Sequence, residues 1–403
     1  MPEQHFITWN RQLDPPLMKV AGAESDEFVL EDGRRVYDFV STSFQAGFGH
    51  SSASIRQRIH QQLDRMPMAS PKSLFGLKDR VSRRLVEFLN QGDVPQSWKI
   101  FYTVSGSEAV ENALKIARHM TGRPRVLSRM RSYHGATLGA LSVGGDWRSE
   151  PHVQFTAGTV RIPEPDDDPQ AELFRKIVEQ TGAERIAAVI VETISGVNGV
   201  VIPPRSWWDG VTRTCRETGI LLIVDEVLAG FGRTGPAFAF HHFGLEPDLV
   251  CMSKGITGGY VPFGAVAVAS RIASRYDDQV LACGLTNYAH PLGLAALDAV
   301  LDQFADSGFR QAKQDLEGVF SAGLKQLDEM PGVVGHRSRG LLAAIDFESA
   351  CPAWQTCVDA GLYVVTRDKM MILAPPFVSR PERLQQAFAT VTGLIEELPV
   401  ARH

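Results

Sequence analysis

Long apolar runs are absent from this chain of 403 residues. No stretch approaches the roughly 18 consecutive apolar residues that a membrane-spanning helix requires. The N-terminal segment MPEQHFITWN also lacks the basic region and following apolar region of a secretory signal. The sequence therefore predicts a protein without a membrane partner that resides in the cytoplasm.

An excess of basic residues is missing as well. The chain carries 41 Lys and Arg against 46 Asp and Glu, a net charge of -5, with both signs mixed along the sequence. Nucleic acids and anionic membrane surfaces are recognised by basic tracts, so neither is expected as a partner. The most acidic segment, EPDDDP at 164–169, is expected to be a solvated loop.

Cysteine is scarce. An odd number of scattered cysteines without a C-x-x-C pair fits neither a disulfide framework nor a zinc site. We therefore expect no metal and buried, reduced thiols. The five cysteines are Cys215, Cys251, Cys283, Cys351 and Cys357.

Short apolar strands followed by amphipathic helices fill the middle of the chain. Such alternation predicts parallel βαβ units and therefore an α/β fold, whose sheet is covered on both faces and binds ligands at the carboxyl ends of its strands. A helix is expected at 204–218. The expected strands are 99–104, 187–192, 221–225, 248–253 and 265–269.

The chain changes character after about residue 306. Long charged helices at 311–329 and 380–397 are expected to flank short strands near 341–347 and 371–374, which indicates a second, smaller α+β domain. The expected division is an N-terminal segment 1–45 that joins the small domain, a large domain 46–305 and a C-terminal small domain 306–403.

Two adjacent carboxylates end the apolar strand LLIVDEV, residues 221–227. A strand that is apolar on both faces is buried on both sides, where an unpaired carboxylate is costly. Neighbouring strand residues point to opposite faces, so Asp225 and Glu226 cannot both face one ligand. We expect one of them to face a cationic group and the other to be structural.

The segment TVSGSEAVENALKIARHM joins a strand end to a helix start. Ser105 and Glu108 form an S-x-x-E capping box, so the helix is expected to begin at Gly106. The backbone N–H groups of Gly106 and Ser107 are then free and aligned with the helix dipole, which suits a phosphate. An ordinary capped helix without a ligand is the alternative.

A lysine directly follows another apolar strand. Lys254 stands in CMSKGITGGYVPFG, residues 251–264, before a glycine-rich loop. Burial lowers the pKa of a lysine and makes the amine a nucleophile that forms a Schiff base with a carbonyl group. An ion pair with Asp225 or Glu226 would explain a buried lysine equally well.

The segment GFGRTG, residues 230–235, matches the dinucleotide fingerprint G-x-G-x-x-G. This fingerprint must open a helix, but Pro236 and the aromatic AFAFHHF that follow show no helical pattern, and the carboxylates upstream would repel a pyrophosphate. An NAD-dependent dehydrogenase is therefore disfavoured. His241 and His242 lack further ligands at metal spacing and are expected to be structural.

A phosphate site, a nucleophilic lysine and a buried acid at three strand ends are what pyridoxal 5'-phosphate needs. Lys254 would bind its aldehyde carbon, Gly106 and Ser107 its phosphate, and Asp225 its protonated ring nitrogen. The ring then accepts the electron pair released when the substrate Cα–H bond breaks, and Lys254 moves the proton. These residues together predict amino-group transfer.

The chain resembles class III aminotransferases, which are fold type I pyridoxal-phosphate enzymes, from about residue 18 to about residue 378. The segments that carry the resemblance are SGSEAVENALKIAR (105–118), RSYHGAT (131–137), AAVIVE (187–192), LLIVDEVLAGFGRTG (221–235), PDLVCMSKGITGGYVPFGAV (247–266) and GLTNYAHPLG (284–293).

The resemblance implies further cofactor contacts. Tyr133 of the YHG motif is expected to stack on the pyridine ring and Val227 to pack on its other face, while Glu192 belongs to the cofactor-side network. Thr286 in this family reaches the phosphate of the neighbouring subunit, which implies a homodimer with shared active sites. The remaining cofactor-binding residues implied by the motifs are Ser105 and His134.

Departures from the family pattern bear on the substrate. Val197 stands where ornithine and γ-aminobutyrate enzymes carry a gating glutamate, which argues against those two groups. The surrounding segments are more similar to the ω-amino acid, amine and taurine aminotransferases that use pyruvate. Trp9 and Phe44 resemble pocket-lining aromatic residues, and Arg367 is the candidate for binding a substrate carboxylate.

The expected function is transfer of a primary amino group from an ω-amino acid or amine to a 2-oxo acid, with pyruvate as the expected acceptor. Another class III chemistry, that of an aminomutase or a decarboxylating transaminase, would retain the same cofactor residues. A catalytically idle protein that binds the cofactor is a more distant alternative, since it need not keep a perturbed lysine.

Overall fold

A seven-stranded, mostly parallel sheet lies at the centre of the structure, a computed structural model that describes residues 4–398. Its order is β4-β10-β9-β8-β7-β5-β6, and β10 runs antiparallel to both neighbours. The five strands predicted here are all confirmed. The strands are β4 Trp98–Thr103, β5 Arg125–Arg129, β6 Thr159–Ile162, β7 Ile186–Glu192, β8 Leu221–Asp225, β9 Leu249–Met252 and β10 Gly264–Ala269.

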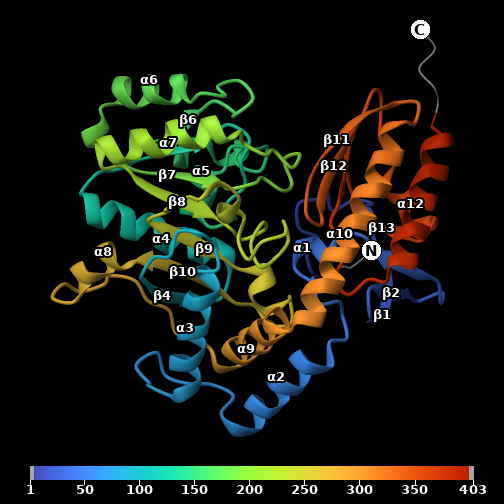
Figure 1. Cartoon of the computed structure of the whole chain (residues 1–403), viewed down its shortest axis with the longest axis horizontal. Helices are drawn as coiled ribbons and strands as arrows, with labels where there is room; N and C mark the ends of the chain where they lie inside the picture. The colour runs from blue at the N-terminus through green and yellow to red at the C-terminus, as the bar shows by residue number, and fades with distance from the viewer. Residues whose placement is uncertain (1–3, 399–403) are drawn as a thin grey trace.

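Helices cover both faces of the central sheet. α4 (Gly106–Thr121) packs on one face against β7, β9 and β10, and α7 (Arg205–Thr218) lies on the other (Figure 1). Alternate residues of β8 enter the two cores: Ile223 joins the apolar side chains of α4, whereas Val224 joins those of α7. This double burial explains why β8 is apolar without interruption.

Two smaller sheets lie beside this layered core. One has the order β1-β2-β3-β13 and the other β11-β12-β15-β14. β3 pairs with β13 in parallel, so strands near the two ends of the chain share one sheet, as the blue and orange-red ribbons of Figure 1 show. These strands are β1 Val20–Glu24, β2 Glu27–Leu30, β3 Arg35–Asp38, β11 Val333–Arg339, β12 Leu342–Phe347, β13 Leu362–Tyr363, β14 Val365–Arg367 and β15 Met370–Leu373.

The division of the chain into segments at residues 45 and 305 stays a prediction. Residues 1–3 of the first segment and 399–403 of the last lie outside the residues that the structure describes. The other α-helices are α1 Ser41–Phe44, α2 Ala53–Arg65, α3 Gly76–Leu89, α5 Leu138–Val143, α6 Glu172–Thr181, α8 Ser270–Ala273, α9 Pro291–Ala305, α10 Ser307–Asp328, α11 Trp354–Asp359 and α12 Pro381–Glu396. The 3₁₀ helices are η1 Glu150–Phe155, η2 Ala183–Arg185, η3 Ala239–Phe243, η4 Lys254–Thr257 and η5 Ser274–Tyr276.

Two sequence predictions concern features that the structure tests directly. Within residues 4–398, no helix combines the length and the apolar character needed to cross a membrane. All five cysteines are free thiols. The prediction that they are buried is wrong for Cys283 and Cys351, which are partly exposed because they lie in loops outside the sheet core.

Candidate active site

The register of the central sheet brings three chemically important residues together. Glu192 and Asp225 are paired neighbours at the ends of β7 and β8, and Asp225 pairs with Cys251 of β9. Lys254 follows two residues after β9 ends. Because these strands are parallel, their carboxyl ends meet at one edge of the sheet.

A single cavity collects most of the predicted cofactor residues. It lies at the carboxyl ends of the strands and at the N-terminus of α4. The predicted residues that line it are Ser105, Gly106, Ser107, Tyr133, His134, Glu192, Asp225, Val227 and Lys254. The lining residues without a predicted cofactor role are Gly135, Ile194, Val197, Leu228 and Ser253.

The two adjacent carboxylates of β8 point in different directions. Asp225 lines the cavity, and its Oδ1 accepts a hydrogen bond from the Val227 N–H at 3.0 Å. Glu226 is fully buried and accepts the N–H groups of Ala239 at 2.9 Å and Phe240 at 2.8 Å, where η3 begins. Burial raises the pKa of Glu226 to about 7 against these two hydrogen bonds. The prediction that one carboxylate is structural is confirmed for Glu226.

His134, which also lines the cavity, holds Asp225 in place. Its Nδ1 lies 2.7 Å from Asp225 Oδ2, and its side chain is fully buried. Because a carboxylate oxygen accepts, Nδ1 is the donor of this hydrogen bond, which fixes the orientation of the imidazole ring. Nε2 is buried and has no partner among the residues that the structure describes.

Lys254 forms no ion pair within the described residues, so the alternative of a salt bridge with Asp225 or Glu226 is wrong. Burial lowers the pKa of Lys254, while the carboxylates of Asp225 and Glu192 oppose that shift. The backbone of Lys254 has φ +48°, an uncommon conformation for a residue other than glycine. A partly buried, unpaired amine with a lowered pKa is suited to attack a carbonyl carbon.

The N-terminus of α4 has room for an anion. Ser105 Oγ accepts the Glu108 N–H at 3.2 Å and Glu108 Oε2 accepts the Val104 N–H at 2.9 Å, so the predicted capping interaction and helix start are confirmed. A Cβ atom on Gly106 would lie 3.0 Å from Val227 Cγ1. A larger residue here would have to displace Val227, which lies next to the free N–H groups of the first turn.

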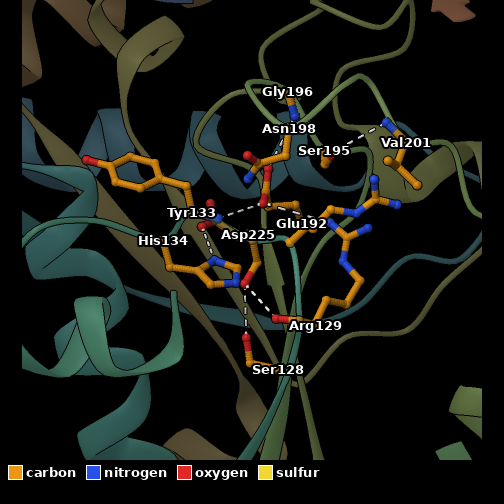
Figure 2. A network of polar contacts seen from close by, with 12 residues as sticks. Ser128, Arg129, Tyr133, His134, Glu192, Ser195, Gly196, Asn198, Val201 and Asp225 are labelled. Carbon is orange, nitrogen blue, oxygen red and sulfur yellow. Dashed lines mark hydrogen bonds and ion pairs between the residues drawn. The ribbon is translucent and has the colours of Figure 1, made fainter. Parts of the chain in front are cut away.

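The sequence motifs do not indicate the buried ion-pair network that supports the cavity wall. Glu192 accepts the Tyr133 N–H at 3.0 Å and lies 3.8 Å from a terminal nitrogen of Arg129, as Figure 2 shows. Arg129 is fully buried and also lies 3.4 Å from Glu164. Glu164 is buried because it pairs with Arg129, and Asp168 is buried where it accepts the N–H groups of Leu173 and Phe174. The solvated loop predicted for EPDDDP is therefore wrong at these two residues. Burial raises the pKa of Glu192, and the charge of Arg129 opposes that shift.

The aromatic candidates lie close to the cavity without lining it. Phe44 is buried, with its ring centroid 5.5 Å from Lys254 Nζ. It belongs to α1, where all four residues have positive φ, a left-handed turn that costs about 1–2 kcal/mol per residue. Asp38 stabilises this turn by accepting the Thr42 N–H at 2.8 Å and hydroxyl at 2.6 Å. Trp9 is half-exposed and lies edge-on to Tyr133, with the ring centroids 6.3 Å apart.

Arg367 and Thr286 also lie outside the cavity lining. Arg367 donates to Asn198 Oδ1 at 3.3 Å, and burial lowers the pKa of its guanidinium group. Thr286 is exposed in the loop before α9. Arg148, which no motif singled out, places its guanidinium carbon 4.5 Å from the ring centroid of Tyr133.

The glycine fingerprint after β8 does not open a helix. Turns follow Gly232 and Gly235, and the next helical element is the five-residue η3. His241 Nε2 lies 2.9 Å from the carbonyl oxygen of Leu89, and His242 Nε2 lies 2.9 Å from that of Thr234. The expectation that this fingerprint does not open a helix is confirmed, and the two histidines contact backbone carbonyl oxygens, as a structural role predicts.

Comparison with known proteins decides the family. A family model described as Aminotransferase class-III matches residues 8–395. The chain is a class III aminotransferase. This aminotransferase is similar to an Omega-aminotransferase of Caulobacter vibrioides, with 31% identity over 427 residues that cover 97% of this chain and 96% of that protein.

Other relatives agree with this assignment. A Beta-alanine--pyruvate aminotransferase of Pseudomonas aeruginosa shares 31% identity over 430 residues, covering 95% of this aminotransferase and 92% of the relative. The solved taurine:2-oxoglutarate aminotransferase of Bifidobacterium kashiwanohense, in complex with PLP and glutamate, superposes with a TM-score of 0.90 and 30% identity over 97% of this chain and 95% of that one. The predicted fold type and the dependence on pyridoxal 5'-phosphate are confirmed.

Proposed function

We propose that this aminotransferase transfers a primary amino group from an ω-amino acid or amine to a 2-oxo acid, with pyruvate as the acceptor. The observation that carries the proposal is the meeting of Lys254, Asp225 and the N-terminus of α4 in one cavity. The curated relatives named for ω-amino donors and for β-alanine and pyruvate support this choice of substrates.

The residues of the cavity fit pyridoxal 5'-phosphate, which supplies an electron sink for the substrate carbon when it is bound. Lys254 would hold the aldehyde carbon of this group and would serve as the base that moves the proton of the substrate carbon. Asp225 would face the ring nitrogen, and its carboxylate is held in place by hydrogen bonds from His134 and the Val227 N–H. Tyr133 and Val227 would lie against the ring, and Gly106 and Ser107 would donate to the phosphate.

The substrate side of the cavity is apolar. Ile194, Val197 and Leu228 contribute to its lining. Because position 197 is a valine, it provides no carboxylate that could pair with an arginine of the site. Leu228 packs closely on Gly196, where a Cβ atom would lie 2.0 Å from Leu228 Cδ1. This wall suits the methylene groups of an ω-amino acid or the carbon chain of an amine.

We further propose a homodimer in which Thr286 completes the active site of the partner. Thr286 is exposed and lines no part of the cavity of its own chain, so its hydroxyl is available to a second copy.

The visible absorbance of the purified protein tests this function. We expect the band of the bound cofactor to bleach with one of β-alanine, taurine, a simple amine or γ-aminobutyrate, added in turn, and to return when pyruvate is added. The donor that bleaches the band identifies the substrate class. A band that no donor changes would contradict amino transfer from these compounds.

The same mixtures separate the related chemistries. An aminomutase converts its donor without a second substrate, and a decarboxylating transaminase releases carbon dioxide. An idle cofactor-binding protein would show the band but no keto product. If the band returns with 2-oxoglutarate and not with pyruvate, the acceptor is 2-oxoglutarate. The assignment of the donor would not change.

A further inference from the structure

Arg148 lies in an aromatic box beside the active-site cavity. Its guanidinium carbon is 4.5 Å from the ring centroid of Tyr133, 5.1 Å from that of Trp147 and 5.4 Å from that of Trp9. Tyr133 itself lines the cavity. A planar guanidinium group gains from such ring contacts and still presents its N–H groups at the edge of the plane.

A second cation shares this box. The guanidinium carbon of Arg367 is 5.9 Å from the ring centroid of Trp147, so Trp147 contacts both arginines. Among the described residues, Asp146 is the carboxylate that pairs with Arg148, and Arg367 has no carboxylate within 4.0 Å. The charges of Asp146 and Asp368 both act on Arg367, but neither carboxylate pairs with it, so its guanidinium group keeps donors for an added anion.

The hydrogen-bonding capacity of these arginines is also incomplete. Arg148 Nε is buried and has no acceptor within residues 4–398. Asn198, which accepts from Arg367, has a buried Nδ2 without a partner in the same part of the chain. The positive charge of Arg148 reaches the reacting amine, since it contributes to the lowered pKa of Lys254.

We propose that Arg148 is a specificity-determining residue that, together with Arg367, binds the acid group of the substrate. The ligand is a carboxylate or sulfonate carried at the end of the substrate remote from the amino group, and Trp147 supports both guanidinium groups. This inference rests on the proposed function for the identity of the substrate. It adds to that function a preference for acidic donors over neutral amines.

Binding of an unreactive acid to the holoenzyme tests the inference without turnover. The probes are propanoate and its neutral counterpart propanamide, and the signal is the fluorescence of the tryptophans, with binding checked by calorimetry. In Arg148→Gln we expect propanoate affinity to fall at least about tenfold, because a charge-assisted contact is lost, while propanamide affinity stays unchanged. Arg148→Lys keeps the positive charge but loses the planar guanidinium group with its paired donors. Its propanoate affinity should therefore lie between that of the wild type and that of Arg148→Gln.

Arg34 provides a matched control. In both Arg34 and Arg148, the backbone N–H and the guanidinium group donate to the aspartate two residues earlier in the chain. This aspartate is Asp32 for Arg34 and Asp146 for Arg148. Arg34 is exposed and contacts no aromatic ring of the site. Arg34→Gln should leave propanoate affinity unchanged.

Three outcomes would overturn the inference: undetectable propanoate binding to the wild type, unchanged propanoate affinity in Arg148→Gln, or equal loss of both probes. If Arg148→Gln does not fold because Asp146 is left unpaired, the double variant Asp146→Asn/Arg148→Gln removes both charges and serves the same comparison. Because these affinities need no catalysis, a failed spectral assay with intact acid binding would reject the proposed function and leave this site standing.

Discussion

Lys254 combines partial burial, a lowered pKa and the absence of an ion pair among the described residues. We predict that Lys254→Ala keeps the cofactor non-covalently but loses its covalent attachment, measured by mass spectrometry after borohydride reduction. Turnover should fall by about 10³-fold or more, since the nucleophile and the proton-transfer group are lost together. Retained turnover would reject the role of Lys254.

A matched control for this variant is Lys313→Ala. Burial lowers the pKa of Lys313 as well, but Lys313 pairs with Glu317 and donates to the carbonyl oxygen of Gly235, away from the cavity. This variant should lose stability and keep covalent attachment of the cofactor.

Asp225 is predicted to control the charge of the cofactor ring. In Asp225→Asn, cofactor binding should persist while kcat falls by about 10²- to 10³-fold, because a preorganised charge opposite the ring nitrogen is removed. The measurement is steady-state turnover at saturating cofactor. Near-normal turnover would mean that another acid, with Glu192 the nearest along the sheet edge, holds the place assigned to Asp225.

At the residue scale, the sequence predicted functional side chains that directly follow apolar strands, but it did not indicate functional side chains in loops. Lys254 and Asp225 could be predicted because a charged residue at a buried strand end needs an explanation. Arg129 ends β5 in the same way, and that signal was available. Arg148 and Glu164 could not be predicted, because their partners are brought together only by the fold.

At the scale of an element, Glu226 connects β8 to the start of η3 through its two backbone hydrogen bonds. Its pKa is about 7 in the folded protein against 4.5 for the free group, so the folded state binds more protons between these values. Its contribution to stability is complete below about pH 4.5 and is lost as the pH rises through about 7. The difference corresponds to about 3 kcal/mol.

Glu226→Gln removes this titration. We predict that the thermal midpoint of the wild type falls relative to that of the variant between about pH 5 and about pH 8, while the variant lacks this part of the pH dependence. Thermal unfolding at both pH values measures the difference. A gap between the two proteins that does not change with pH would contradict the titration of Glu226.

The boundaries of the five predicted strands of the large sheet could be read from the sequence, because each is a largely apolar segment followed by polar residues. β5 (RVLSR) and β6 (TVRI) were not predicted, because arginine, serine and threonine interrupt their apolar residues. The left-handed turn of α1 was not, since Thr42 and Phe44 disfavour positive φ on their own and adopt it through contacts such as those of Asp38. The pairing of β3 with β13 was also hidden, because two short strands far apart in sequence carry no signal of their register.

At the scale of the whole molecule, Thr286 tests the proposed homodimer. Thr286→Ala should weaken cofactor affinity about tenfold or more, because a hydrogen bond to a charged phosphate is lost. Mixing the Lys254→Ala and Thr286→Ala proteins should restore one complete site per mixed dimer, measured as recovered activity at limiting cofactor. If each chain used its own Thr286, the mixture would show no recovery.

The parallel pairing of β3 with β13 also has a consequence for synthesis of the chain. Tyr37 pairs with Leu362, so the first small sheet cannot close on the ribosome until its last strand has emerged. The central sheet, by contrast, is complete once residue 269 has left the exit tunnel. The strands β1 to β3 must therefore wait with an unpaired edge during most of translation, and this edge is where a chaperone or a misfolding partner would act first.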